Sequence, residues 1–223
     1  MPWRAVLFDL DGTLVDTAPD FVSAANALRA ERGLAALAAS RITPHVSNGS
    51  AAVTAAALDI SPSDDEFEQA RADLLDTYKR YVGRAATIYP ALDQLLTKLG
   101  ELDIPWGIVT NKPLNYTTPL LEQLNLAANC SVLICPDHVK QPKPSPEGLL
   151  LAAQKLKLPS KRCIYIGDHQ RDIEAGKAAQ MSTIAVGYGY LDVNDNPHEW
   201  QATHYAKTPQ ALSQLLLSGL TQR

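Results

Sequence analysis

The stretch AVLFDLDGTL, residues 5–14, decides the fold, because an apolar run ends there abruptly in acidic residues. Such a short, bounded apolar run predicts a strand buried on both faces, as in a parallel sheet. Asp9 would follow that strand at the edge of the sheet where ligands bind. If the strand geometry holds to Asp11, the two carboxylates point to one side and need a cation, a shared proton or a donor. A strand followed by a plain acidic turn is the alternative.

Length and composition narrow the class of protein. The chain has 223 residues, of which 46% are hydrophobic and 20% charged, and its net charge is −4. These values are typical of a globular protein with a full core. Without a basic tract or a long apolar run, we expect no nucleic-acid partner and no membrane partner. Cys130, Cys135 and Cys163 lack paired spacing, which favours reduced thiols and a cytoplasmic location.

A helical block follows the first strand. Apolar residues recur at helical spacing over residues 17–84, and no strand signal interrupts them. We therefore predict a helical cap at residues 17–84, inserted into a catalytic core of residues 1–16 and 85–223. A polar break at residues 45–50 divides the block.

The remainder of the chain alternates between strands and helices. Strand signals occur at residues 106–109, 132–135, 163–166 and 183–186, with helical patterns between them and a last helix from Thr208. This alternation predicts an α/β fold with a Rossmann-like, three-layer core, in which helices cover both faces of a parallel sheet. Residues 188–200 form the longest irregular stretch, and loops of this length are often functional.

Reactive side chains follow four of the predicted strands. Beyond the pair at the first strand, these are Thr110, Lys143, Asp168 and Asp172. Each has an ordinary explanation by itself, as a strand residue, a solvated charge or a helix cap. Parallel strands bring their carboxyl ends to one edge, however, and this convergence favours a common site.

The chemistry of the set indicates phosphoryl transfer. Carboxylates at positions 9, 168 and 172 suit a hard cation such as Mg²⁺, which prefers oxygen ligands. A lysine and a hydroxyl remain to bind further anionic oxygens. A carboxylate can itself act as the nucleophile and form an aspartyl-phosphate.

These motifs resemble those of the haloacid dehalogenase superfamily of phosphohydrolases. DLDGTL at residues 9–14 is similar to the first motif, and Thr110 in VTNKP to the second. Lys143 in KPSP is similar to the third, and GDHQRD at residues 167–172 to the fourth. The motifs occur in the family's order, the resemblance covers essentially the whole chain, and residues 17–84 lie where the family inserts its helical cap.

The resemblance implies a role for each motif residue. Asp9 would be the nucleophile and a metal ligand, and Asp11 the general acid and then the base, with its backbone carbonyl on the metal. Thr110 and Lys143 would hold the phosphoryl oxygens. His169 stands where many relatives carry a second acid, so metal binding by this loop rests on two residues. The implied catalytic residues are Asp9, Asp11, Thr110 and Lys143, and the implied Mg²⁺ residues are Asp9, Asp11, Asp168 and Asp172.

Within the superfamily, the chain resembles phosphatases of phosphoglycolate and of N-acetylmuramic acid 6-phosphate. VSNG at residues 46–49 is similar to the glycolate type. Residues 134–140 and the stretch from Tyr188 to Trp200 are more similar to the muramic acid type, which we favour. Tyr190 and Trp200 would either pack on a sugar ring or pin the long loop. The expected substrate-binding residues are Thr110, Asn111, Lys112, Lys143, His45, Ser47, Asn48, Gly49, Tyr190 and Trp200.

The leading hypothesis is therefore a phosphomonoester hydrolase that acts on a small phosphorylated substrate as a monomer or a homodimer. A β-phosphoglucomutase-like mutase would use the same nucleophile and return the phosphoryl group to the substrate. A protein that binds a phosphometabolite without catalysis is a further alternative, but the complete set of acid, lysine and metal residues argues against it.

Overall fold

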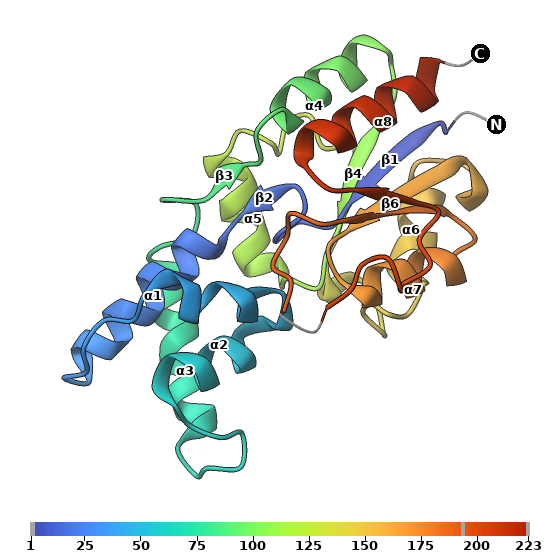
Figure 1. Ribbon diagram of the computed structural model, residues 1–223. Coiled ribbons are helices and arrows are strands. Elements are labelled where there is room, and N and C mark those ends of the chain that lie inside the picture. Colours follow the sequence, from blue (N-terminus) through green and yellow to red (C-terminus); the bar gives the residue numbers. More distant parts are fainter. Residues whose placement is uncertain (1–2, 193–194, 222–223) are drawn as a thin grey trace.

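β1 (Ala5–Phe8) lies inside a six-stranded sheet of order β5-β4-β1-β6-β7-β8. The computed structural model describes residues 3–192 and 195–221 (Figure 1). Every adjacent pair in this sheet is parallel, and all four residues of β1 are buried. The sheet confirms the predicted parallel core. Its other strands are β4 (Trp106–Val109), β5 (Val132–Ile134), β6 (Cys163–Gly167), β7 (Ser182–Val186) and β8 (His204–Ala206).

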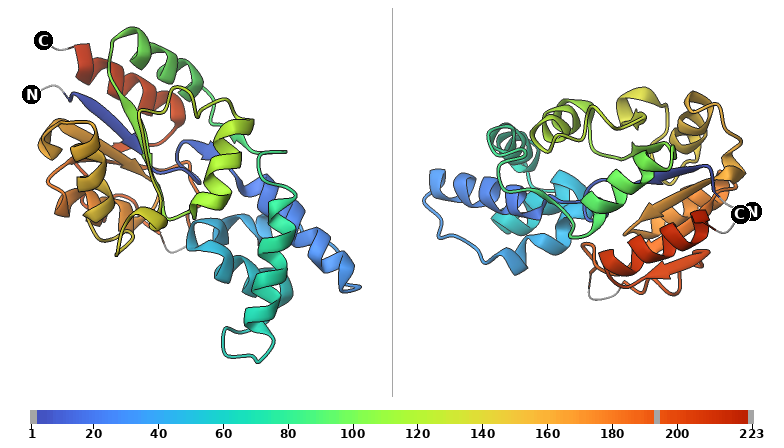
Figure 2. Two further views of the ribbon diagram at one scale, coloured as in Figure 1. Left: turned by 180° about the vertical axis from the view of Figure 1, so that it is seen from behind. Right: turned by 90° about the horizontal axis from the view of Figure 1, so that it is seen from above.

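Helices cover both faces of this sheet, as the alternation of strands and helices predicts. In Figure 2, helices lie on either side of the sheet. Val6 and Phe8 pack in the cluster that holds the leucines of α4 and α8, whereas Ala5 and Leu7 pack in the cluster of α6 and α7. The alternation of side chains along one strand thus builds a core on each face. The helices of the core are α4 (Leu92–Glu101), α5 (Leu114–Gln123), α6 (Glu147–Lys155), α7 (Gln170–Ala178) and α8 (Pro209–Thr221).

β8 lies in a segment that the sequence pattern does not identify as a strand. It has three residues, and only Ala206 among them is fully buried. A strand this short carries no apolar run, so pairing with β7 determines it rather than its own sequence. Of the stretch 188–200 that precedes it, residues 193 and 194 lie outside the described residues.

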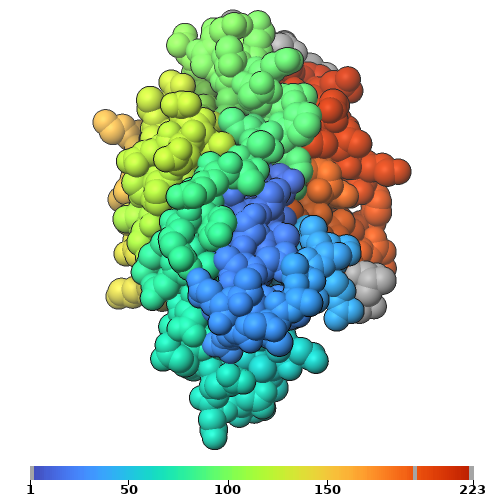
Figure 3. Space-filling model, turned by 90° about the vertical axis from the view of Figure 1, so that its left-hand side faces the viewer, coloured from blue at the N-terminus to red at the C-terminus, as the bar shows by residue number. Residues whose placement is uncertain are grey.

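The helical block lies beside the sheet, and its buried side chains continue the hydrophobic core of one sheet face. We call the segment that contains its three helices the cap, and it lies at one end of the molecule (Figure 3). Phe21 and Tyr78 stack there with their ring centroids 3.9 Å apart, which joins the first and third helices. The helices are α1 (Ala18–Glu31), α2 (Gly49–Leu58) and α3 (Phe67–Lys79), and a 3₁₀ helix at Thr43–Asn48 precedes α2. None of the helices in the described ranges is long and apolar enough to span a membrane.

The chain enters and leaves the cap through a small two-stranded sheet. β2 (Val15–Asp16) and β3 (Thr87–Ile88) pair in antiparallel fashion. Beside them, the buried carboxylate of Asp20 accepts hydrogen bonds from the backbone N–H groups of Gly83, Ala85 and Ala86, at 2.7, 2.8 and 3.1 Å. One side chain at the start of α1 therefore fixes the segment that returns to the core.

We expect Asp20→Ala to lower the free energy of unfolding by about 3 kcal/mol, because three backbone donors lose their charged acceptor. Urea denaturation measures this loss. Asp20→Asn is the matched control, since its amide oxygen still accepts one of the bonds, and its loss should be smaller. A loss below about 1 kcal/mol for Asp20→Ala would show that these hydrogen bonds do not hold the junction.

Candidate active site

A cavity of about 340 Å³ lies between the carboxyl edge of the sheet and the cap. Its volume is within the range of small-molecule sites, roughly 300–1,000 Å³. The structure brings to it many of the residues that the sequence indicated. On the core side it is lined by Asp9, Asp11, Thr110, Asn111, Lys112 and Lys143.

Asp9 directly follows β1, and its backbone N–H donates to the carbonyl of Ile166 in β6 at 2.8 Å. Its Oδ1 lies 2.8 Å from Nζ of Lys143, yet it has no partner with hydrogen-bond geometry among the described residues. Burial raises the pKa of the Asp9 carboxyl from 3.8 to about 7, while Lys143 opposes this rise and Asp172 adds to it. The carboxylate is thus held at the cavity in an environment that compensates its charge only in part.

Asp11 is held by a hydroxyl and an ammonium group, and the ammonium group in turn contacts the cap. Its Oδ1 accepts from Oγ1 of Thr17 at 2.5 Å and from Nζ of Lys112 at 3.0 Å. The same ammonium donates to the hydroxyl of Tyr78 in α3 at 2.8 Å. Burial lowers the pKa of Lys112, but Asp11 and Tyr78 outweigh it and raise that pKa above its usual value. Lys112, which we expected to bind substrate, therefore also links Asp11 to the cap.

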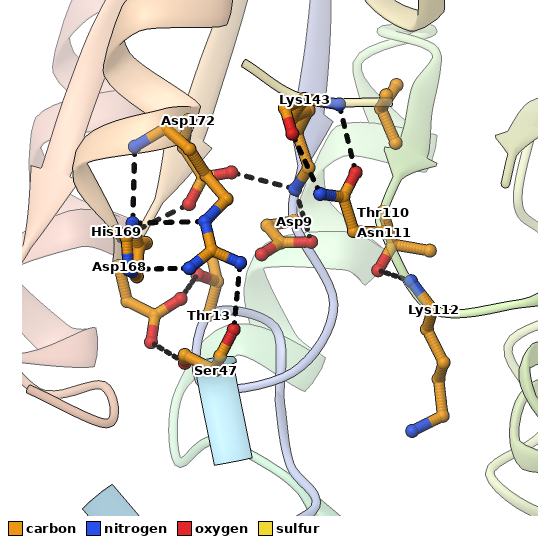
Figure 4. A network of polar contacts seen from close by, with 12 residues as sticks. Asp9, Thr13, Ser47, Thr110, Asn111, Lys112, Lys143, Asp168, His169 and Asp172 are labelled. Atoms are coloured by element: carbon orange, nitrogen blue, oxygen red, sulfur yellow. Dashed lines mark hydrogen bonds and ion pairs between the residues drawn. The ribbon is translucent and has the colours of Figure 1, made fainter. Parts of the chain in front are cut away.

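Lys143 joins the carboxylates of Asp9 and Asp172 at the wall of the cavity (Figure 4). Its Nζ lies 2.8 Å from Asp9 and 2.7 Å from Oδ1 of Asp172, and it donates to the hydroxyl of Tyr165 at 2.9 Å. Tyr165 was not among the residues that the sequence indicated. It lies inside a buried strand, where its apolar neighbours conceal the polar function of its hydroxyl.

Asn111 and Thr110 arrange the loops around this lysine. The side-chain amide of Asn111 donates to the backbone carbonyl of Lys143 and accepts from its backbone N–H, both at 3.0 Å. The hydroxyl oxygen of Thr110 accepts from the backbone N–H of Lys112 at 3.1 Å. This leaves the hydroxyl proton of Thr110 available to donate to a bound anion.

Three carboxylates form a group that could hold a metal ion. One oxygen each from Asp9, Asp168 and Asp172 lies within 4.8 Å of the others. Burial raises the pKa of Asp168 to about 6, and Asp172 adds to the rise. All-oxygen donors of this charge suit Mg²⁺, and Oδ1 of Asp9, which has an ion pair but no hydrogen bond, leaves the charge of the group only partly compensated.

Asp168 is held firmly by its surroundings. Its Oδ1 accepts from Thr13, and its Oδ2 accepts from Oγ of Ser47 and the backbone N–H of Tyr190, at 2.9, 2.9 and 3.0 Å. Gly12 has a φ of +78°, and a Cβ at this position would collide with the Asp168 carboxylate. Glycine is therefore required in the DLDGTL motif for both its conformation and its size.

We expect Mg²⁺ to raise the midpoint of thermal unfolding more at about pH 8 than at about pH 5. The pKa values of Asp9 and Asp168, about 7 and about 6, exceed the ordinary 3.8, so the folded protein retains protons that the unfolded chain releases. Stability without metal therefore falls as the pH rises from about 4 to 7. A cation that binds the ionised carboxylates offsets this loss, chiefly at the higher pH.

Thermal denaturation in Mg²⁺ and in EDTA across this pH range measures the difference. An Mg²⁺-induced shift of the same size at both ends of the range would contradict a metal site built from Asp9 and Asp168. The Asp168→Asn variant should show a smaller shift at the higher pH.

The cap contributes part of what the sequence indicated, and one residue lies elsewhere. Ser47, Asn48 and Gly49 line the cavity. His45 does not, because it lies at a separate surface hollow beside Asp59, and its expected contact with substrate is not supported by this arrangement. Val46 and Ser47 line the cavity, whereas the side chain of His45 lines the separate hollow. The polar residues at positions 45–50 alone could not indicate which of them face the cavity.

Arg171 is a cavity residue that sequence reasoning missed. Its Nη1 donates to the backbone carbonyl of Ser47 and its Nη2 to Oδ1 of Asn48, both at 3.0 Å. The ring of His169 accepts from its Nε at 3.2 Å. Arg171 thus connects the GDHQRD segment to the cap, although it is not one of the residues for which the motif predicts a catalytic or metal-binding role.

Tyr190 and Trp200 do not line the cavity, contrary to the sugar-packing interpretation. Tyr190 is buried, and its hydroxyl donates to Oδ1 of Asp16 at 2.7 Å and accepts from the backbone N–H of Ala18 at 2.8 Å. Trp200 is also buried, and it packs with Ile173. Both rings stabilise the long loop, which was the alternative interpretation, and Tyr190 also supports the base of the cap.

Comparison with known proteins agrees with the geometry. A family model described as haloacid dehalogenase-like hydrolase matches residues 6–186. An N-acetylmuramic acid 6-phosphate phosphatase of Pseudomonas putida is 42% identical over 220 residues, 99% of both chains. A phosphoglycolate phosphatase of Xanthomonas campestris is 39% identical over 210 residues, 94% of both chains.

A solved structure extends the likeness to the fold. A haloacid dehalogenase family hydrolase of Deinococcus radiodurans, crystallised with bound phosphate and sodium, has a TM-score of 0.77 to this chain at 25% identity. The match covers 99% of this chain and 98% of that one. The chain therefore belongs to the haloacid dehalogenase-like hydrolase family, and it is a phosphatase.

Proposed function

We propose that this phosphatase is a Mg²⁺-dependent phosphomonoester hydrolase that works through an aspartyl-phosphate on Asp9. The observation that carries the proposal is the placement of Asp9 at the cavity, beside the ammonium of Lys143 and two residues before Asp11. A buried carboxylate with incomplete charge compensation is a suitable nucleophile for an electrophilic phosphorus. Mg²⁺ held by Asp9, Asp168 and Asp172 would supply further neutralisation of the phosphoryl charge.

In the first step, an oxygen of Asp9 attacks phosphorus, and the bond between phosphorus and the leaving oxygen breaks. Asp11 gives its proton to that oxygen, so the leaving group departs as an alcohol. Lys143 and Thr110 stabilise the charge on the phosphoryl oxygens during the transfer. Lys112 and Thr17, which contact Asp11, keep its carboxyl group oriented toward the cavity.

In the second step, Asp11 removes a proton from water, and the resulting oxygen attacks phosphorus. The bond between Asp9 and phosphorus breaks, inorganic phosphate leaves, and both aspartates return to their starting states. The closed cap limits access of water until the alcohol has left.

We propose N-acetylmuramic acid 6-phosphate as the substrate. The support is the 42% identity to the Pseudomonas putida phosphatase of that compound, which extends over 99% of both chains. Phosphoglycolate is the second candidate, because the Xanthomonas campestris relative at 39% identity is a phosphatase of that acid.

A phosphate-release assay with Mg²⁺ tests the function. It compares these two esters with a panel of sugar phosphates and nucleotides. We expect the highest kcat/KM with N-acetylmuramic acid 6-phosphate, and a higher value for another ester would replace this substrate. In ¹⁸O-water the released phosphate should gain the label, whereas a mutase would return unlabelled phosphoryl groups to its substrate.

A further inference from the structure

The cavity face of α3 extends away from the catalytic residues toward a second positive charge. Arg71, Leu75 and Tyr78 line the cavity, at the spacing of one helical face. Tyr78 marks the catalytic end, because its hydroxyl contacts the ammonium that pairs with Asp11. Seven residues of α-helix rise about 10 Å along the axis, so the backbones of Arg71 and Tyr78 are roughly that far apart and Arg71 belongs to the end of the cavity away from Asp11.

Arg71 is held in place, yet its charge is only loosely paired. Its Nε donates to Oγ of Ser50 at 3.0 Å, and Ser50 also lines the cavity. Its Nη1 lies 3.5 Å from Glu68, whose side chain is 78% exposed. A solvated pair of this kind contributes little energy. Within the described ranges, Nη2 has no hydrogen bond or ion pair.

The other cations of the cavity are already engaged. Lys112 pairs with Asp11, and Lys143 pairs with Asp9 and with Asp172. Arg171 donates to the backbone carbonyl of Ser47 and to the side-chain oxygen of Asn48, and so holds the 3₁₀ helix before α2. Among the cations that line the cavity, Arg71 is therefore the one best able to accept an anionic group of the substrate.

The part of the cavity between its two ends is partly apolar. Leu75 lies between Tyr78 and Arg71 on α3, and Val46 and Phe21 of the cap also line the space. Apolar walls between two polar ends suit a sugar ring, which has apolar faces and polar edges. A two-carbon acid would leave this surface uncovered.

We infer that Arg71, positioned by Ser50, binds a carboxylate of the substrate at the end of the cavity away from the catalytic residues. This inference rests on the proposed phosphomonoesterase function, and it narrows the substrate to a phosphorylated sugar acid. N-acetylmuramic acid 6-phosphate fits, since its carboxylate is on the lactyl ether at C3 and its phosphate is on C6, so part of the sugar ring separates the two charges. In phosphoglycolate the charges lie within roughly 5 Å of each other, given bonds of about 1.5 Å, which is about half the separation of the Arg71 and Tyr78 backbones along α3.

The test compares two substrates in the wild type and in Arg71→Gln. N-acetylglucosamine 6-phosphate is the same sugar phosphate without the lactyl ether that carries the carboxylate, and Arg71→Gln isolates the contribution of the charge. We expect the wild type to favour N-acetylmuramic acid 6-phosphate by about 10- to 100-fold in KM, the usual range for a charge-assisted hydrogen bond. Arg71→Gln should remove this preference while kcat stays within about twofold, and Arg71→Lys should restore part of it.

Arg84→Gln is the matched control, because Arg84 is an exposed arginine after α3 that does not line the cavity. This variant should keep the full preference. If Arg71→Gln keeps the preference, or lowers the activity on both sugars equally, Arg71 does not bind the carboxylate.

A second measurement separates this inference from the proposed substrate. Free N-acetylmuramic acid should inhibit hydrolysis of p-nitrophenyl phosphate more strongly than free N-acetylglucosamine does, and Arg71→Gln should abolish that difference. If the wild type fails to hydrolyse N-acetylmuramic acid 6-phosphate but shows this inhibition, the proposed substrate is wrong and the carboxylate site stands. Equal inhibition by both sugars in the wild type overturns the carboxylate site.

Discussion

Asp9→Asn is expected to lower kcat by at least about 10⁴-fold, with the fold intact. The amide cannot attack phosphorus, and neighbouring groups cannot replace it because Asp11 and Asp168 are held by other partners. The same change removes a carboxyl group whose pKa burial raises to about 7. Without metal, the variant should therefore be at least as stable as the wild type at about pH 8, where ionised Asp9 is destabilising.

Phosphate release from a good substrate and thermal unfolding in EDTA measure the two effects. Asp65→Asn, at an exposed position in the cap, should leave both properties unchanged. Unchanged phosphate release by Asp9→Asn would exclude an aspartyl-phosphate. A marked loss of stability in EDTA would show that Asp9 is a structural residue.

Lys143→Met is expected to lower both the free energy of unfolding and kcat. The Lys143 side chain is 3% exposed, and it lies between the carboxylates of Asp9 and Asp172. Removing one partner from a buried ion pair typically costs about 3–5 kcal/mol, because the remaining charge is uncompensated. We also expect kcat to fall by about 10³-fold, since the ammonium no longer stabilises the phosphoryl oxygens.

The pH dependence identifies the cause of this loss. Without the ammonium, protonation of Asp9 removes the uncompensated charge, so the loss of stability should be smaller at about pH 5 than at about pH 8. Lys143→Arg should recover part of the stability but little activity, because guanidinium has another shape. Lys161→Met, at an exposed position, is the control. If Lys143→Met unfolds at the same urea concentration as the wild type, the buried pairing does not stabilise the fold.

The sequence was sufficient to predict the core because its strands are apolar runs that end in polar residues. β1 and β4 are buried along their whole length, and parallel pairing necessarily brings Asp9 and Thr110 to one edge. Local patterns and topology agree here, so the residue types at the strand ends could be interpreted together. β8 could not be predicted in this way because its three residues do not form an apolar run.

Contacts between the cap and the core could not be predicted in the same way. Lys112 contacts Tyr78 of α3, and Arg171 contacts the 3₁₀ helix before α2, only when the two parts dock. The direction of His45 depends on how a short 3₁₀ helix turns at the polar break. Tyr190 shows the same limit, because an aromatic residue in a glycine-rich loop can serve a ligand or the fold.

Because β2 pairs with β3, the two ends of the cap segment lie side by side. Val15 faces Ile88 and Asp16 faces Thr87, so the chain leaves and re-enters the core at points about 5 Å apart. A segment with adjacent ends can be lengthened, shortened or replaced during evolution without altering the register of the large sheet. Asp9, Lys143 and Asp168 lie outside this segment, whereas Arg71 lies inside it. Changes at Arg71 can therefore alter selectivity while the core residues stay in place, provided that the cap keeps the contacts of Ser47 and Tyr78 with Asp168 and Lys112.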